Sequence, residues 1–300
     1  MAGFAENINK PGEPFRVLIA PLDWGLGHAT RCIPLIRWLL EQHCQVWVAA
    51  NGPIAQLIQT EFPQLNLVAC PEYAIRLSQH SKQLRLKLVL QLPRIWKIYW
   101  QEHRWLQDFI EKQQIQGVIS DNRYGMYSRQ IPSVCITHQL HIETGSAWIN
   151  KLAFRVNQQL LACFSAVWVP DEEAFPGLAG NLSHPTRKPN PPVYYLGNLS
   201  RLTLQPTNRK IPLLILLSGP EPQRTRLENM ILSKTDWPPN SLLVRGKPGN
   251  TEALQHPQLT IEAHASAQQL SEWIVAAETI LCRSGYSTVM DLVQLQKTAL

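Results

Sequence analysis

The first residues that could do chemistry form the segment Asp23-Trp24-Gly25-Leu26-Gly27-His28, which follows an apolar run and precedes a helical pattern. Gly25 and Gly27 would let a substrate approach the backbone closely. A histidine at the start of a helix is held neutral, because the partial positive charge there disfavours the imidazolium. Two interpretations of His28 are evenly balanced: a general base for a substrate hydroxyl, or a helix-capping or packing side chain.

A second polar cluster, Ser120-Asp121-Asn122-Arg123-Tyr124-Gly125, directly follows the apolar run 117–120. Asp121 could orient His28 and stabilise its charged form, as the third member of a catalytic triad does. Taken alone, the cluster also fits an Asx-turn that ends a strand. The other polar groups at this rim are interpreted as substrate contacts: Asn122, Arg123 and, after the next apolar run, His138.

Two motifs in the last third of the chain fit a bound phosphate group. Ser218–Gln223 connects a strand to a helix and could present amides, although its prolines exclude a P-loop. In Cys282–Asp291 a strand ends in arginine, and Ser-Gly-x-Ser-Thr opens a helix whose free amides form an anion site. A simple N-cap would explain the hydroxyls but not the Arg-Ser-Gly before them. The predicted contacts are Gly219, Gln223, Arg245, Arg283, Ser284, Gly285, Ser287 and Thr288, with Asp291 as an acceptor for ribose hydroxyls.

These motifs lie between strand and helix patterns that alternate along the chain. Such alternation is typical of parallel sheets with crossover helices. We predict strands at 15–20, 45–49, 66–70, 117–120, 133–137, 166–169, 193–196, 211–217, 241–245 and 279–282. We predict helices ending near 40 and at 53–60, 148–161, 267–277 and 288–294, and a helical segment 82–113 interrupted at Pro93. The proline-rich segment 185–192 indicates a passage between two α/β domains, 1–197 and 198–300.

Length and composition limit the class of protein. Three hundred residues suit two domains, and 45% hydrophobic with 17% charged residues is typical of a globular protein with a buried core. The net charge of +6 favours acidic partners, of which nucleic acid is disfavoured because no nucleic-acid-binding motif occurs. The six scattered cysteines, the lack of a signal peptide and the lack of a bilayer-spanning run predict buried free thiols and a cytoplasmic protein.

In content and order, the motifs resemble the family-28 glycosyltransferases, of which MurG is the best-known member. The turn ending in His28 is similar to that family's first loop, whose histidine is its proposed base. Tyr195–Asn198 is similar to its interdomain linker, and Ser218–Gln223 to its donor-phosphate loop. Arg283–Asp291 is similar to its donor-binding signature, with aspartate where a glutamate usually contacts ribose.

The resemblance implies an α/β protein of the GT-B fold, with two Rossmann-like domains whose parallel sheets face each other across a cleft. It also implies inversion at the anomeric carbon, a nucleotide sugar (UDP by analogy) as co-substrate, and no cofactor or metal; no Asp-x-Asp site occurs. It gives His28 the role of catalytic base, to which the residue pattern above adds Asp121 as the second catalytic residue, and it places the phosphate contacts above on the donor. The acceptor contacts are then Gly25, Gly27, Asn122, Arg123 and His138.

The sequence departs from the family pattern in two places, and each leads to an expectation. The first loop has larger residues than the family's usual run, so we expect a different acceptor. The chain stops at 297–300, where the family begins another strand, so we expect the C-terminal domain to be incomplete.

Residues 76–104 form a basic stretch with seven Lys/Arg and a single acid, Glu102, interleaved with leucine, isoleucine and aromatic residues. Such an amphipathic helix suits an anionic membrane surface, which would bring the protein to a lipid-linked acceptor. In the alternative, the apolar face packs on the sheet and the charges are solvated.

We therefore expect an inverting, metal-independent glycosyltransferase that moves a sugar from a nucleotide diphosphate to a hydroxyl acceptor. A sugar-nucleotide epimerase or hydrolase on the same fold is one alternative. A non-catalytic subunit that binds donor or membrane and needs a partner is another.

Overall fold

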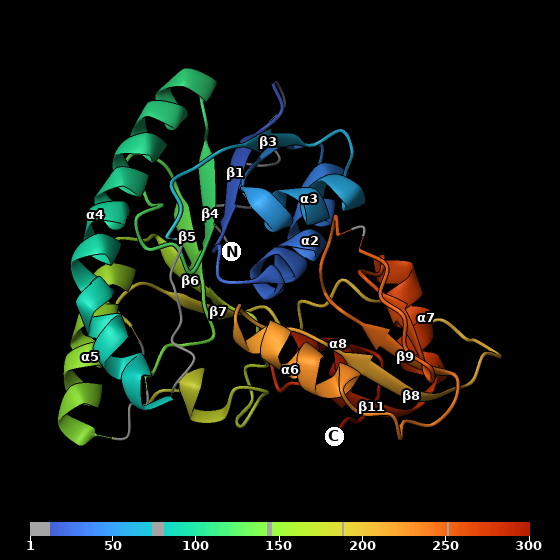
Figure 1. Cartoon of the computed structure of the whole chain (residues 1–300). Coiled ribbons are helices and arrows are strands. Elements are labelled where there is room, and N and C mark those ends of the chain that lie inside the picture. The colour runs from blue at the N-terminus through green and yellow to red at the C-terminus, as the bar shows by residue number, and fades with distance from the viewer. Residues whose placement is uncertain (1–12, 74–80, 143–145, 188, 251) are drawn as a thin grey trace.

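The computed structural model describes residues 13–73, 81–142, 146–187, 189–250 and 252–300 (Figure 1). In these ranges the chain forms two parallel sheets, one after the other along the sequence, each covered by helices. The predicted pair of α/β units is confirmed. The predicted division at Gly197 falls in the connection between the last strand of the first sheet and the first strand of the second.

The first sheet has the strand order β3-β2-β1-β4-β5-β6-β7, and every pairing is parallel. Its central strands are buried on both faces, which explains why they read as continuous apolar runs. The strands are β1 (Arg16–Pro21), β2 (Gln45–Ala49), β3 (Asn66–Val68), β4 (Gly117–Asp121), β5 (Ser133–Ile136), β6 (Ala166–Val169) and β7 (Val193–Tyr195).

Helices cover both faces of this sheet (Figure 1). On one face, α2 (Leu26–Glu41) and α3 (Gly52–Glu61) bury apolar side chains such as Ile33 and Leu57 against β1 and β2. On the other face, α4 (Ser81–Gln113) and α5 (Ala147–Leu161) pack with Leu106 and Leu161. A short 3-10 helix, η1 (Gly180–Leu182), follows β6.

The second sheet has the order β10-β9-β8-β11, again with parallel pairings. Its strands are β8 (Ile211–Leu216), β9 (Ser241–Val244), β10 (Leu259–Glu262) and β11 (Ala277–Cys282). Its helices are α6 (Gln223–Leu232), α7 (Ala267–Ala276) and α8 (Tyr286–Gln294). Ser266 caps α7 with a complete capping box to Gln269, the pattern that fixes a helix start.

The structure differs from the expected elements in two places. Pro93 does not interrupt α4, which continues through it. A proline removes one backbone hydrogen bond, but Ile98, Leu106 and Ile110 beyond it are buried against neighbouring elements and hold the helix in place. Strand β10 was not predicted, because only one of its four residues is fully buried and its apolar run is short.

The basic stretch lies only partly within the described residues: 76–80 fall outside them, and the side chains of 81–90 are not described. None of the helices in the described ranges is both long and apolar enough to cross a bilayer.

Candidate active site

A cavity of about 1120 Å³ lies where the carboxyl ends of the two sheets face each other. It is lined by the loop after β1, the starts of α2 and α8, and parts of α4 and α5. Of the predicted site residues, those that line it are Gly25, Gly27, His28, Asn122, His138, Gly219, Arg283, Ser284, Gly285, Ser287 and Thr288. Motifs from both halves of the chain therefore line the same cavity.

Strand pairing explains how the first half of the site is assembled. Pro21 at the end of β1 is in register with Asp121 at the end of β4, and β4 pairs with β5. Asp121 at the end of β4 and the segments after β1 and β5, which carry His28 and His138, therefore lie together at the carboxyl end of the sheet. Open parallel sheets bind ligands at the carboxyl ends of their strands.

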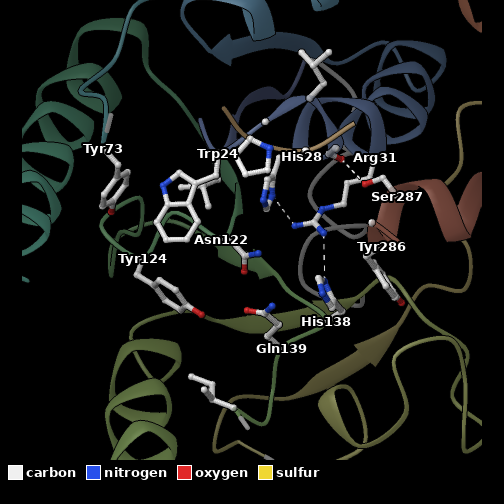
Figure 2. Close-up of a pocket in the computed structure, with 18 of the residues that line it drawn as sticks. Trp24, His28, Arg31, Tyr73, Asn122, Tyr124, His138, Gln139, Tyr286 and Ser287 are labelled. Atoms are coloured by element: carbon white, nitrogen blue, oxygen red, sulfur yellow. Dashed lines mark hydrogen bonds between the residues drawn. The ribbon is translucent and has the colours of Figure 1, made fainter. Parts of the chain in front are cut away.

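His28 lies in the first turn of α2, with its side chain 18% exposed and its Nδ1 3.2 Å from Oδ1 of the buried Asp121. A third residue, Arg31, contacts both from the next turn of the helix, and Figure 2 shows it beside His28. Its Nε donates to Asp121 Oδ2 at 2.6 Å, and its Nη2 contacts Asp121 Oδ1 and lies 2.8 Å from His28 Nδ1. Arg31 Nη1 lies 3.4 Å from Nδ1 of His138.

The buried cluster shifts the ionisation of each member. Burial lowers the pKa of His28; Asp121 opposes this shift and Arg31 reinforces it. Burial also lowers the pKa of His138, with help from Arg31, to about 3. Burial alone would raise the pKa of Asp121, but the charges and hydrogen bonds of Arg31 and His28 together outweigh it, and the value falls to about 2. At neutral pH the cluster therefore holds an ionised Asp121–Arg31 pair between two neutral imidazoles.

The second half of the site is built on β8 and β11, which pair in parallel and bring the loops after them together. Arg283 follows β11, packs against Gly219 in the loop after β8, and donates from Nη1 to the Ser218 carbonyl at 3.2 Å. Gly219 has φ +99, and a Cβ there would collide with the guanidinium, so glycine is required.

Two helix N-termini point into the cavity, those of α2 and α8, and within the described residues no side chain caps either of them. Uncapped first-turn amides and the helix dipole attract anions. The lining also contains Arg31 and Arg283, and no Asp or Glu belongs to the described lining. The part of the cavity at the start of α8, beside Arg283, is therefore suited to a phosphate group.

The two halves are in direct contact at the base of the cavity. Ser287 Oγ donates to the Gly27 carbonyl at 2.9 Å, and Tyr286 donates from its hydroxyl to the Pro170 carbonyl at 2.6 Å. The Tyr286 ring stacks on His138 with ring centroids 4.0 Å apart (Figure 2). The start of α8 therefore rests against the histidine cluster of the first sheet.

The remaining wall of the cavity is apolar and aromatic. Trp24, Tyr73 and Tyr124 lie on the side away from Tyr286 and Ser287 (Figure 2). Side chains from α4 and α5 complete this wall: Leu92, Ile95, Trp96, Tyr99, Val156 and Leu160. A substrate held here would present an apolar surface to the protein.

Two predicted contacts are corrected, because each arginine is buried and forms ion pairs with acidic side chains of the protein. Arg123 is 1% exposed and donates from Nε to Glu102 Oε1 at 2.6 Å, behind the cavity wall. Arg245 is 2% exposed and pairs with Glu228 and Glu252. Neither guanidinium lines the cavity.

Two further predicted donor contacts, Gln223 and Asp291, do not line the cavity either, and their roles remain predictions. Gln223 begins α6. Asp291 Oδ1 accepts a hydrogen bond from Ser200 Oγ at 2.5 Å, and burial raises the pKa of Asp291 to about 6.

Sequence reasoning missed Arg31, Trp24, Tyr124 and Tyr286. Arg31 carried a usable signal, because residues three apart lie on the same face of a helix and Arg31 is three residues after His28. Within the described residues, no group of three or more His, Cys, Asp or Glu side chains is placed to hold a metal ion.

The chain is similar in fold to solved structures of glycosyltransferases. CalG4, the calicheamicin glycosyltransferase, matches with a TM-score of 0.59 and 13% identity over 96% of this chain and 79% of its own. SnogD, from Streptomyces nogalater, matches with a TM-score of 0.59 and 14% identity over 96% and 82%. MurG from Acinetobacter baumannii matches with a TM-score of 0.47 and 15% identity over 96% and 78%. No protein-family model and no curated protein sequence matches the chain. The chain has the GT-B fold, which it shares with CalG4 and SnogD.

Proposed function

We propose that the protein is an inverting glycosyltransferase that moves a sugar from a nucleoside-diphosphate donor to a hydroxyl acceptor. One observation carries the proposal: an uncapped helix start beside Arg283 and the His28 cluster line the same cavity from opposite sheets. The GT-B fold supports sugar transfer, and UDP is the donor nucleotide implied by the resemblance to family 28.

On the donor side, the diphosphate would lie at the start of α8. The first-turn amides and Arg283 would bind its oxygens, with Ser284, Gly285, Ser287 and Thr288 around them. Charge develops on the leaving diphosphate in the transition state, and fixed donors in a partly closed cavity stabilise it. These groups would do the work that a metal ion does in other transferases, so we propose that no metal is required.

On the acceptor side, His28 would remove the proton from the attacking hydroxyl. Its Nδ1 has two neighbours, the acceptor Asp121 Oδ1 at 3.2 Å and the donor Arg31 Nη2 at 2.8 Å. Arg31 can only donate, so its closer contact suits an unprotonated Nδ1. Base chemistry requires the other tautomer, whose Nδ1–H donates to Asp121 and whose Nε2 is free to take a proton. Attack on the face opposite the diphosphate would invert the anomeric carbon.

The acceptor would carry an apolar body, and we propose that it is lipid-linked and met at a membrane surface. The apolar wall of the cavity reaches the exterior between α4 and α5, where Leu92, Trp96 and Val156 are both exposed and part of the lining. Exposed Trp100, Trp148, Ile149 and Leu152 extend this surface. Exposed cations on the described parts of the same two helices include Arg94, Lys97, Lys151 and Arg155.

The test of this function is His28→Ala, assayed with a panel of nucleotide sugars and hydroxylated lipids. We expect transfer to fall by about 10²–10⁴-fold, because a positioned base contributes that much. Donor affinity, measured by calorimetry, should change by less than about twofold, because the donor binds at the opposite sheet. His256→Ala, which changes a histidine outside the cavity lining, is the matched control.

Full turnover by His28→Ala would refute the base assignment. Release of free sugar from the donor with no acceptor dependence would instead identify a hydrolase.

A further inference from the structure

Arg31 occupies an unusual place for an arginine, because it is 3% exposed and directed at three other polar side chains. Its Nε and Nη2 hold both oxygens of Asp121. The same Nη2 lies 2.8 Å from His28 Nδ1, and Nη1 lies 3.4 Å from His138 Nδ1. Figure 2 shows the guanidinium between the two imidazole rings.

We infer that Arg31 is a positioning residue of this site: its guanidinium neutralises the buried Asp121 carboxylate and keeps the imidazoles of both His28 and His138 uncharged. The inference rests on the proposed function in one respect, that His28 is the group that acts on the acceptor. Arg31 itself would touch no reacting atom.

The reasoning follows from the charges around His28. A buried carboxylate with no other cation would draw a proton onto the nearest imidazole, giving an ion pair in which His28 could no longer accept a proton. Arg31 binds the Asp121 carboxylate through a bidentate contact and places a positive charge beside the His28 ring. An imidazolium would then be repelled by Arg31 as well as attracted by Asp121.

The other charged or titratable groups near His28 come from several elements. Asp23, in the loop after β1, acts in the same direction as Asp121. His138, after β5, is itself neutral and stacks on Tyr286 of α8. Arg283 lines the same cavity from the second sheet. Only Arg31, among these, contacts both histidines and the carboxylate.

The experiment is an NMR titration of histidine-labelled protein, which reads the charge of each ring without any turnover. In Arg31→Met we expect the His28 titration midpoint to rise by at least about one pH unit, the size of effect that one close charge has on a buried group. Arg31→Lys keeps the charge and should restore most of the wild-type midpoint. The signal of the exposed His43, at the far end of α2, is the internal reference.

A folded Arg31→Met protein whose His28 titrates as in the wild type would overturn the inference. If Arg31→Met does not fold, Arg31→Gln decides the matter, because it removes the charge and keeps a polar side chain. Its His28 midpoint should rise as in Arg31→Met, and an unchanged midpoint would overturn the inference.

A failure of the proposed function would give a different result. If the rings titrate as expected but the wild-type protein transfers no sugar to any acceptor, the proposed activity is wrong and the charge role of Arg31 stands.

Discussion

At the scale of single residues, the shifted pKa of Asp291 predicts how the stability of the fold depends on pH. Its pKa is raised from 3.8 to about 6, because the side chain is buried and Ser200 and Arg201 only partly offset the burial. A raised carboxyl pKa means that folding favours the protonated form. The stability contributed by this group is therefore complete below about pH 4 and is lost as pH rises through about 6.

Asp291→Asn should remove this loss. We expect the variant to be more stable than the wild type by as much as about 3 kcal/mol at pH 8, and to show a smaller or no advantage at pH 4. Urea unfolding at both pH values measures this. Asp108→Asn, which neutralises an exposed carboxylate on α4, is the control. Equal pH dependence of the wild type and Asp291→Asn would contradict the account.

The positions of side chains could be predicted where they directly follow a buried parallel strand. His28, Asp121 and His138 follow neighbouring parallel strands, so their meeting could be expected from the apolar runs before them. Arg123 and Arg245 failed for the opposite reason. Their partners Glu102 and Glu228 lie on helices, and no local pattern shows that a distant helix will bury an acid against a given arginine.

At the scale of elements, the contact between the starts of α2 and α8 is sterically tight. A Cβ added at Gly27 would lie 2.7 Å from Ser287 Oγ, so Ser287 would have to turn and lose its bond to the Gly27 carbonyl. We expect Gly27→Ala to cost about 1 kcal/mol in unfolding and to weaken donor binding. Thermal unfolding and calorimetry measure the two effects.

The control for this contact is Ser287→Ala. It removes the hydroxyl that the new methyl would meet, so adding Gly27→Ala to it should cost clearly less than in the wild type. Additive costs would show that the two residues do not interact.

The exposed apolar surface of α4 and α5 predicts binding to anionic membranes. Replacing Trp96 and Trp148, which are 57% and 74% exposed, by glutamine should reduce binding to phosphatidylglycerol vesicles by about tenfold or more. Cosedimentation measures this, and higher salt should weaken wild-type binding. Trp38→Gln, at an exposed tryptophan of α2, should have no effect. Equal losses from all these changes would exclude a specific membrane face.

Most elements were predictable because buried parallel strands and amphipathic helices leave clear periodic signals. The prediction missed β10, because its apolar pattern is short and its residues are only partly buried. It also placed a break at Pro93, through which α4 continues. In both places tertiary packing, rather than local sequence preference, determines the structure.

At the scale of the whole molecule, the two sheets are joined by contacts between residues far apart in the chain. Arg201 pairs with Glu61 at 2.5 Å, and Asn198 donates to the Met290 carbonyl at 2.8 Å. With the Ser287–Gly27 contact, these set how the two sheets face each other. The sequence predicts two α/β units, but such pairings leave no periodic pattern, so the orientation of the units had to come from the structure.

The central claim is that a nucleoside diphosphate binds at the start of α8, facing His28 across the cavity. Crystal structures with UDP, TDP or GDP test it directly. We expect phosphate oxygens within about 2.7–3.2 Å of the first-turn amides of α8 and of Arg283, with the terminal phosphate towards His28. Nucleotide bound elsewhere, with the start of α8 empty, would contradict the account.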